Sequence, residues 1–515
     1  MTLDQGSVPF DASSCTQLHQ LIARQAAAQP AGAALWWQGT AINYANLQRD
    51  VLAAAGRLAA DGTVGDCIAL LSWNCPEFVQ LLYGVPAAGR ILVPLNARLA
   101  PAELIYQLQC TGATTLFGDS ALLKPLLAHA DFPHGVRIIK LGDDYETWLA
   151  NERSAELPAT RGEDPAWILF TSGSTGRPKG AVLSHRSLLA GLRSAALARP
   201  VNADDKYYYP FPLFHVAAHN VLLQHQYGAA VVLARSFDAA DTLRACRELQ
   251  VTAMSLAPTM IAMLLDQPDF TPADLRSVRT IGYGASAMPQ TLLQRLLAGS
   301  DVGLCQSYGM TELSGSVAFL TPEDHRMAAG DKPQLLNSVG RPVPTAQIKL
   351  IDDEGRPCPV GAPGEILVQA PQCMQRYWND DAATEQVLAG DWLHTGDIGR
   401  FDDAGYLYIV DRKKDMIISG GENIASREIE EVLRRHAAVR DCAVIGLPDA
   451  KWGESPCAVL RLNEDISDRD LSAYCRELLG GYKVPRRWIR VDHLPLNAAG
   501  KIDKPLLRRR FTAPG

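Results

Sequence analysis

Short apolar runs alternate with helix-like stretches along the first half of the chain. Residues 67–71 and 230–233 are continuous apolar runs of the length that buried β-strands have. Residues 45–60 and 102–109 instead place apolar side chains at helical spacing. Because the alternation continues to residues 277–283, we predict layers of helices and strands, an α/β fold, for the large N-terminal part of the chain.

Glycine and proline become frequent between residues 333 and 364. Such a composition is typical of short strands joined by tight turns. We therefore expect a small β-rich subdomain at the end of the N-terminal part.

The sequence beyond residue 415 has the pattern of one compact, mobile α+β domain. A strand-like run precedes a helix that begins at Ser426, and two more strand-like runs follow. The charged residues 411–414 stand just before this part, and charge suits an exposed hinge. We predict an N-terminal domain at 1–410, a hinge at 411–414 and a small C-terminal domain at 415–515.

Composition and charge narrow the function classes. The 515 residues are 47% hydrophobic and 20% charged, which excludes disordered, collagen-like and coiled-coil proteins. A net charge of −7 argues against nucleic acid as a partner. The eleven cysteines include no C-x-x-C pair, and their odd number favours reduced thiols over a disulfide framework.

The N-terminus lacks the features of an export signal. Residues 1–14 are polar and acidic, where a signal peptide needs a basic start and an apolar core. The sequence also has no long apolar run free of charge, so we expect no transmembrane segment. These features predict a cytoplasmic protein, and they leave open whether it is a monomer or a homodimer.

A strand-like run leads into a loop of hydroxyl and glycine residues at 171–180. Hydroxyls and backbone N–H groups in such a loop can converge on phosphate oxygens. It is not a Walker A loop, because Pro178 replaces the second glycine and Gly180 follows the lysine. The candidate phosphate-binding residues are Thr171, Ser172, Gly173, Ser174, Thr175, Gly176 and Lys179.

This loop resembles the signature loop of the adenylate-forming enzymes, the superfamily of acyl-CoA synthetases, peptide-synthetase adenylation domains and firefly luciferase. The resemblance continues in order through five further motifs and covers most of the chain. These motifs are Tyr308-Gly309-Met310-Thr311-Glu312, Thr395-Gly396-Asp397, residues 411–415, Ser419-Gly420-Gly421-Glu422-Asn423 and Asn497-Ala498-Ala499-Gly500-Lys501.

The resemblance implies a two-step reaction. A carboxylate attacks ATP to form an acyl-AMP and pyrophosphate, and a thiol, coenzyme A in the ligases, then takes the acyl group. Mg²⁺ accompanies ATP, and Glu312 resembles its protein ligand, which agrees with the preference of Mg²⁺ for one or two carboxylates beside phosphate oxygens.

Further roles follow from the same resemblance. Lys501 resembles the catalytic lysine, which neutralises charge as the carboxylate attacks phosphorus, and Thr311 and His215 are also expected at the reaction centre. Tyr308 is expected to stack on adenine opposite Gly284, Ala285 and Ser286. Asp397 is expected to accept hydrogen bonds from the ribose hydroxyls, with Arg412 beside it. Lys414 aligns with the hinge position, and Gly420 and Gly421 are expected to leave room for pantetheine.

The acyl pocket is the least specified part of the site. The inferred lining, Val216, Ala217, Ala218, Tyr283 and residues 309–317, is small and apolar, which favours a fatty or aromatic acid. We find no aspartate there for an amino acid and no arginine for a second substrate carboxylate. His185 is interpreted as a structural residue. His219 and His225 are also interpreted as structural, with polar contacts to the substrate as the alternative.

The leading interpretation is an ATP-dependent carboxylate:CoA ligase. One alternative is an adenylation enzyme that loads the phosphopantetheine of a separate carrier protein. A non-catalytic scaffold would be expected to lose Lys501, Glu312 or Asp397, and all three are present. Luciferase-like oxidation has no identifying residue in this sequence.

Overall fold

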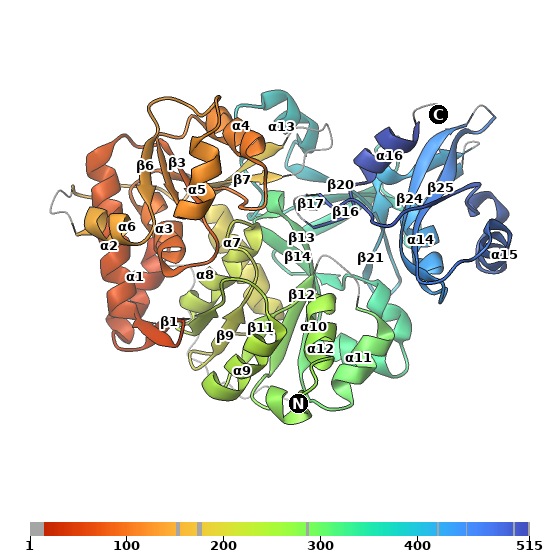
Figure 1. Ribbon diagram of the computed structural model, residues 1–515, viewed down its shortest axis with the longest axis horizontal. Coiled ribbons are helices and arrows are strands. Elements are labelled where there is room, and N and C mark those ends of the chain that lie inside the picture. Colours follow the sequence, from red (N-terminus) through yellow and green to blue (C-terminus); the bar gives the residue numbers. More distant parts are fainter. Residues whose placement is uncertain are drawn as a thin grey trace. The chain divides into compact units, whose positions relative to one another are not determined.

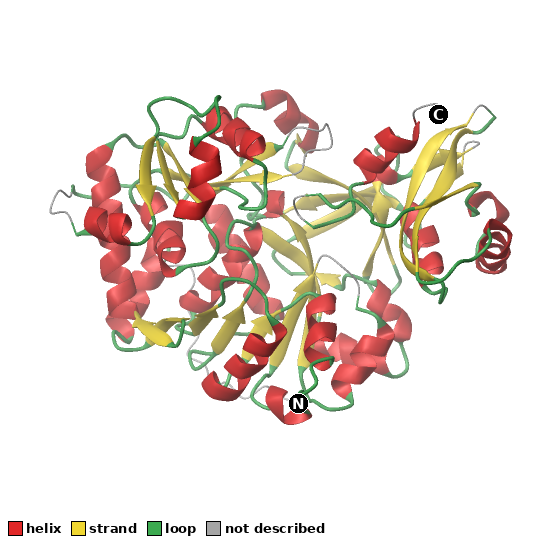
Figure 2. Cartoon of the chain, viewed as in Figure 1, coloured by secondary structure: helices red, strands yellow, loops and turns green. Residues whose placement is uncertain are grey.

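The computed structural model describes residues 15–150, 155–171, 178–284, 288–419, 422–449, 451–497 and 500–512. The chain divides into two compact units. The first unit comprises Met1–Gln347 and Gln369–Leu393, and the second comprises Ile348–Val368 and His394–Gly515. Helices alternate with strands through most of the chain, so the predicted α/β class is confirmed (Figures 1 and 2).

The first unit contains a nine-stranded sheet in the order β15-β14-β13-β12-β11-β9-β10-β1-β2. The neighbouring strands from β13 to β1 are parallel, so their carboxyl ends meet at one edge, where ligands of open α/β sheets bind. The strands are β1 (Ala33–Trp37), β2 (Thr40–Asn43), β9 (Lys206–Tyr209), β10 (Ala230–Leu233), β11 (Ala253–Ser255), β12 (Thr280–Gly284), β13 (Gly303–Met310), β14 (Gly315–Leu320) and β15 (Arg341–Pro342).

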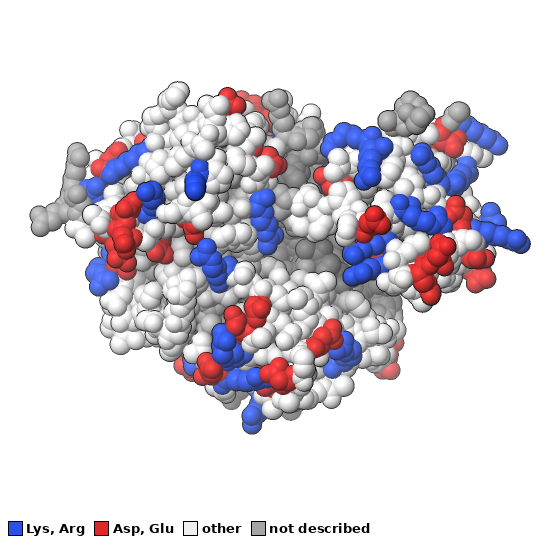
Figure 3. Space-filling model, in the orientation of Figure 1, with Lys and Arg blue, Asp and Glu red and all other residues white. Residues whose placement is uncertain are grey.

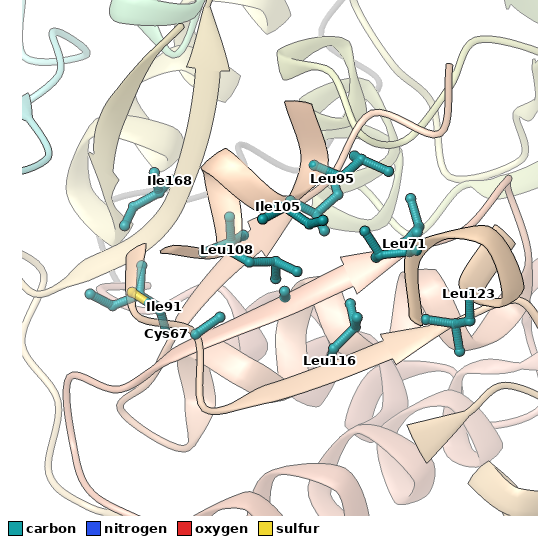
Figure 4. Packing of buried hydrophobic residues seen from close by; sticks show 14 of the residues in the cluster. Cys67, Leu71, Ile91, Leu95, Ile105, Leu108, Leu116, Leu123 and Ile168 are labelled. Carbon is teal, nitrogen blue, oxygen red and sulfur yellow. The ribbon is translucent and has the colours of Figure 1, made fainter. Parts of the chain in front are cut away.

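A seven-stranded sheet in the order β18-β8-β7-β4-β3-β5-β6 completes the framework of this unit. Its strands are β3 (Cys67–Leu71), β4 (Ile91–Pro94), β5 (Thr115–Gly118), β6 (Arg137–Lys140), β7 (Pro165–Thr171), β8 (Lys179–Ser184) and β18 (Arg376–Tyr377). In Figure 4, Ile105 and Leu108 of one helix and Leu123 of the next pack with Leu71 and Leu116 of this sheet. The two helices therefore hold one face of the sheet by apolar burial.

Helices surround both sheets of the first unit. They are α1 (His19–Ala28), α2 (Tyr44–Asp61), α3 (Pro76–Ala87), α4 (Pro101–Thr111), α5 (Ser120–Leu127), α6 (Asp143–Leu149), α7 (His185–Ala198), α8 (His219–Gln226), α9 (Ala239–Leu249), α10 (Pro258–Leu265), α11 (Gln290–Leu297), α12 (Pro322–Ala329) and α13 (Asp381–Val387). The short 3-10 helices are η2 (Val216–Ala218), η3 (Pro272–Leu275), η4 (Thr311–Leu313) and η5 (Pro333–Asn337). Ser184 caps α7 by accepting the Ser187 N–H, which explains why that helix begins directly after β8.

A further five-stranded sheet has the order β16-β17-β20-β19, with β21 paired to β20. It forms where the frequent glycine and proline residues predicted short strands. Its strands are β16 (Gln347–Ile351), β17 (Gly364–Gln369), β19 (Leu388–Ala389), β20 (Trp392–Phe401) and β21 (Leu407–Arg412).

The rest of the second unit is built on the sheet β23-β22-β25-β24, with β26 paired to β25. Alternate residues of its two long strands face opposite sides. Val444 and Leu460 pack on one side with the helices 426–434 and 468–478. Ile445 and Val459 pack on the other side with Leu507 of the helix 504–512. The elements are η6 (Lys413–Asp415), β22 (Ile417–Ser419), β23 (Glu422–Ile424), α14 (Ser426–Arg434), β24 (Val439–Asp449), β25 (Gly453–Leu462), α15 (Asp468–Leu478), η7 (Gly481–Lys483), β26 (Arg487–Arg490) and α16 (Lys504–Thr512).

Several predicted elements have the bounds that the sequence indicated. Strands β3 and β10 begin and end at the predicted residues, and α14 begins at Ser426. The predicted hinge residues are not uniformly exposed: β21 extends through Arg412, and Asp411 is buried because it accepts hydrogen bonds from the backbone N–H and hydroxyl of Ser426. The hinge therefore stays a prediction.

Two simpler expectations concern cysteines and membranes. All eleven cysteines are unpaired thiols. Among the described residues, every helix is too short or too polar to span a lipid bilayer.

Candidate active site

The two ends of the candidate phosphate loop lie side by side. Thr171 at the end of β7 pairs with Lys179 at the start of antiparallel β8. The sheet therefore fixes the two ends of the loop. Ser172, Gly173, Ser174, Thr175 and Gly176 lie outside the described residues.

Glu312 is buried in the short η4 turn between β13 and β14. The turn requires glycine at two places: a Cβ on Gly309 would overlap the backbone of Gly315, and Gly315 itself has φ of +135°. Thr311 begins the same turn, and its carbonyl accepts the Ser314 N–H at 3.0 Å. The motif thus holds a carboxylate at a fixed place in the sheet edge.

The Glu312 carboxylate has a buried partner that sequence reasoning missed. The hydroxyl of Tyr377 donates to its Oε1 over 2.8 Å, and burial, followed by the Glu312 charge, raises the pKa of Tyr377. The Lys179 ammonium lies 5.3 Å from the centre of the Tyr377 ring. Tyr377 therefore connects the carboxylate of η4 with the lysine of the phosphate loop.

The described residues supply no ion pair for this carboxylate. None of their Lys, Arg or His nitrogens lies within 4 Å of Glu312, whose side chain is held by a neutral phenol. A buried carboxylate that lacks a cationic partner is costly. A divalent cation suits this position, although no group of three metal-ligating side chains occurs in the described parts of the chain.

The candidate adenine residues occupy neighbouring strands. Gly284 ends β12 and pairs with Ser307 of β13, directly before the half-buried Tyr308. A Cβ on Gly284 would lie 3.1 Å from two oxygens of Ser307, so glycine permits the close approach. Ala285 and Ser286 lie outside the described residues.

The aromatic segment before η2 places His215 against Phe214, with ring centres 4.8 Å apart. His219, at the start of α8, must donate from Nδ1 because its partner is the Val216 carbonyl, at 2.8 Å. Its ring lies 3.3 Å from the position that a Cβ on Gly315 would occupy. Burial lowers the pKa of His219 to about 4, so the ring is neutral at pH 7.

The other two histidines have structural partners. His185 accepts the Leu18 backbone N–H at Nδ1 over 3.2 Å, and His225 bonds the Tyr83 hydroxyl over 2.8 Å. Burial lowers the pKa of each to about 4. These contacts agree with the structural interpretation of His185 and His225.

The second unit carries the candidate ribose residues. Asp397 of β20 is buried and forms a 2.6 Å ion pair with Arg412, its cross-strand partner in β21. Gly396, with φ of +68°, allows the turn that places Thr395 under Asp397, whose N–H bonds the Thr395 hydroxyl at 3.1 Å. The strand pair thereby holds a carboxylate acceptor in a fixed place.

Lys501 stands in a tight turn of the same unit. The Asn497 N–H donates to the Lys501 carbonyl at 2.7 Å, and Gly500 has φ of +75°. Lys501 remains exposed as a residue, yet burial around its ammonium and then the charge of Arg412 lower its pKa, while Asp397 raises it. The charges of Arg412 and Asp397 therefore act on the Lys501 ammonium.

The remaining candidates lie at the edges of β21 and β22. Lys414 is exposed within η6, and Gly420 and Gly421 lie outside the described residues between β22 and β23. The structure thus groups Lys179, Glu312 and Tyr377 in the first unit. It groups Asp397, Arg412 and Lys501 in the second.

Comparison with protein families decides the membership of the chain. The family model described as AMP-binding enzyme matches residues 22–378, and the one described as AMP-binding enzyme C-terminal domain matches residues 428–501. The chain belongs to the AMP-binding enzyme family.

Relatives of this AMP-binding enzyme match it over nearly the whole length. A feruloyl-CoA synthase of Amycolatopsis is 37% identical over 95% of this chain and 98% of its own. A fatty acid–[acyl-carrier-protein] ligase of Streptomyces coeruleorubidus is 33% identical over 94% of each chain. The solved structure of an O-succinylbenzoate coenzyme A synthetase from Bacillus subtilis, in complex with ATP and magnesium ion, has a TM-score of 0.84 and 32% identity, covering 96% of this chain and 99% of that one.

The structure also places an arginine where the sequence suggested none. Arg199 follows α7, and its guanidinium donates to Ser255 of β11 and to Asn220 of α8. Basic residues are common at the C-terminal ends of helices. The sequence therefore gave no signal that Arg199 contacts Ser255 and Asn220.

Proposed function

We propose that the protein is an AMP-forming acid:thiol ligase that activates a fatty or aromatic carboxylic acid with Mg²⁺-ATP and transfers the acyl group to coenzyme A. The observation that carries the proposal is the match to both AMP-binding enzyme domains in a chain that retains Lys501, Glu312 and Asp397. The naming of a 37% identical relative as a feruloyl-CoA synthase supports coenzyme A as acceptor.

The first unit supplies the phosphate and metal functions. Glu312 would hold Mg²⁺ through its carboxylate, and the ion would take its other ligands from phosphate oxygens and water. When bound, Mg²⁺ neutralises phosphate charge. Tyr377 fixes the rotamer of Glu312 by its 2.8 Å hydrogen bond, and Lys179 adds a positive charge from the phosphate loop. The chemistry of this step therefore depends on electrostatic stabilisation and alignment.

The second unit supplies the ribose and carboxylate functions. Asp397 accepts hydrogen bonds from the ribose hydroxyls, and Arg412 forms an ion pair with that carboxylate at 2.6 Å. Lys501 neutralises the charge that gathers as the substrate oxygen bonds to the α-phosphorus and pyrophosphate leaves. One such preorganised donor typically contributes about 3 to 4 kcal/mol. Lys414 is the proposed hinge, and Gly420 and Gly421 line the proposed pantetheine path.

A panel of carboxylic acids tests this function. Pyrophosphate release is measured for each acid with and without coenzyme A, and the thioester is identified by mass spectrometry. We expect at least one fatty or aromatic acid to give acyl-AMP without coenzyme A and acyl-CoA with it. Failure of every acid to release pyrophosphate would refute the proposal.

A carrier-protein acceptor is the second candidate. It is favoured by the 33% identical relative that is named a fatty acid–[acyl-carrier-protein] ligase. If acyl-AMP accumulates with coenzyme A present, addition of a holo carrier protein tests this alternative. Acyl transfer to the carrier alone would replace coenzyme A in the proposal.

A further inference from the structure

The guanidinium of Arg199 is enclosed by neutral groups. It donates to the Ser255 hydroxyl at 3.3 Å and to the Asn220 side-chain oxygen, and it lies 5.8 Å from the centre of the Tyr207 ring. Its Nε is buried and has no hydrogen-bond partner. A desolvated donor of a charged group is costly when no acceptor meets it.

No carboxylate balances this charge. Among the described residues, no Asp or Glu oxygen lies within 4 Å of Arg199. Some exposed arginines of the same unit do have such partners, as Arg244 has in Asp241 and Arg295 in Asp266. Figure 3 likewise shows acidic and basic side chains mixed over the visible surface. Arg199 therefore differs from these paired surface arginines, and its buried Nε has no hydrogen-bond partner.

Gly282 makes room for this side chain. A Cβ at this position of β12 would overlap Nη1 of Arg199. Asn220 is itself oriented, because its amide nitrogen donates to the Ala217 carbonyl at 2.9 Å. Both the space and the direction of the guanidinium are thus set by neighbouring residues.

The location connects Arg199 with two candidate substrate segments. Asn220 lies in α8, just after His215 and η2, and Gly282 lies two residues before Gly284 at the end of β12. Ser255 is the last residue of β11, the parallel neighbour of β12. The cation is therefore held near the sheet edge at which open α/β folds bind ligands.

We infer that Arg199 determines acyl specificity by donating to an oxygen at the end of the acyl group remote from the reacting carboxylate. This inference rests on the proposed function and specifies its substrate class: acids with a distal hydroxyl or carboxylate. A site built to bond an oxygen rejects the analogue that lacks it, because its donors are then left unpaired.

Matched acids test the inference. We compare kcat/KM for cinnamic, 4-hydroxycinnamic and 4-carboxycinnamic acids, and for octanoic and octanedioic acids, in pyrophosphate release by the full-length enzyme. The wild type should prefer an oxygen-bearing member of at least one series by roughly tenfold or more. The hydroxyl and carboxyl arms identify which oxygen is bound.

Two variants then examine the residue. Arg199→Met should lower the preference ratio at least tenfold, and Gly282→Ala should lower it in the same direction by displacing the guanidinium. The ratio does not depend on the fraction of folded enzyme, so it separates recognition from a structural role. Arg199→Lys should restore part of the ratio, and Arg244→Met, on the exposed surface, should leave it unchanged.

Results that would overturn only the inference can be distinguished from a result that would overturn the proposed function. An unsubstituted acid preferred by the wild type in both series, or equal losses for all acids in Arg199→Met, would overturn the inference and leave the proposed function standing. If no acid of the wider panel releases pyrophosphate, the proposed function fails, and the inference fails with it.

Discussion

The Tyr377 hydroxyl donates to Oε1 of Glu312 over 2.8 Å, across 65 residues of sequence. The bond joins the two-residue strand β18 to the η4 turn, and both groups are buried. Because the phenol is neutral, it orients the carboxylate without cancelling its charge. Among the described side chains, Glu312 thus has this neutral partner and no cationic one.

Tyr377→Phe should weaken metal use. Loss of the hydrogen bond frees the carboxylate to rotate, and one bond to a charged group contributes about 1.5 to 3 kcal/mol. We expect pyrophosphate release to fall and the Mg²⁺ concentration for half-maximal rate to rise, each by roughly tenfold or more. The control is Tyr408→Phe, since Tyr408 also bonds a carboxylate, that of Asp402 at 3.1 Å, in the second unit. Equal Mg²⁺ dependence in wild type and Tyr377→Phe would contradict the assigned role.

Lys501→Ala should separate the two half-reactions. If Lys501 acts only as the carboxylate attacks the α-phosphorus, its removal costs adenylation a hundredfold or more, on the order of 3 to 4 kcal/mol. Thioester formation from supplied acyl-AMP should largely persist. Arg509→Ala removes another exposed cation of the C-terminal part and serves as the control. Parallel losses in both steps would indicate damage to the fold or a different role.

Gly420→Leu should produce the opposite pattern. A branched side chain on the proposed pantetheine path should block acyl transfer to coenzyme A and spare acyl-AMP formation. The comparison uses pyrophosphate released without coenzyme A and thioester formed from supplied acyl-AMP. Wild-type thioester rates in a normally folded variant would remove Gly420 from the path.

Local pattern predicted the elements and motifs better than it predicted their partners. Strands β3 and β10 are unbroken apolar runs, so their bounds follow from burial on both faces. The link between Tyr377 and Glu312 depends instead on how β18 and η4 approach β8 across the fold. The spacing of these residues in the sequence does not indicate that approach.

The contacts of Arg199, the proposed specificity residue, could likewise not be predicted from the sequence. The sequence analysis identified a small apolar lining and no arginine near it. Arg199 reaches Ser255 and Asn220 only because α7, α8 and β11 converge. The contact depends on tertiary packing, which also explains why Gly282 could not be recognised as the residue that accommodates it.

Gly309→Ala should damage the turn that holds Glu312. The added methyl group would overlap the backbone carbonyl of Gly315, and backbone cannot move aside as a flexible side chain can. Overpacking of this kind costs about 1 to 3 kcal/mol. We expect a lower urea midpoint together with a loss of adenylation. Gly162→Ala is the control, because its Cβ would lie 3.5 Å from its nearest neighbour, the Thr16 carbonyl oxygen.

Acid should destabilise the first unit through its buried histidines. Burial lowers the pKa of His185, His219 and His225 to about 4, whereas the unfolded values lie near 6.5. The unfolded chain therefore binds more protons between these values, so stability is complete above about pH 6.5 and falls progressively toward pH 4. The loss is on the order of 2 kcal/mol per histidine at pH 5.

His185→Gln isolates one of these contributions. Nδ1 of His185 accepts the Leu18 N–H and its buried Nε2 has no partner, so a second proton on this ring has no acceptor. The decrease in the urea midpoint from pH 7.5 to pH 5 should be smaller in His185→Gln than in the wild type. His129→Gln, at a histidine whose side chain is 33% exposed, is the matched control and should keep the wild-type decrease. Identical pH profiles for His185→Gln and the wild type would show that His185 titrates alike in the folded and unfolded chains.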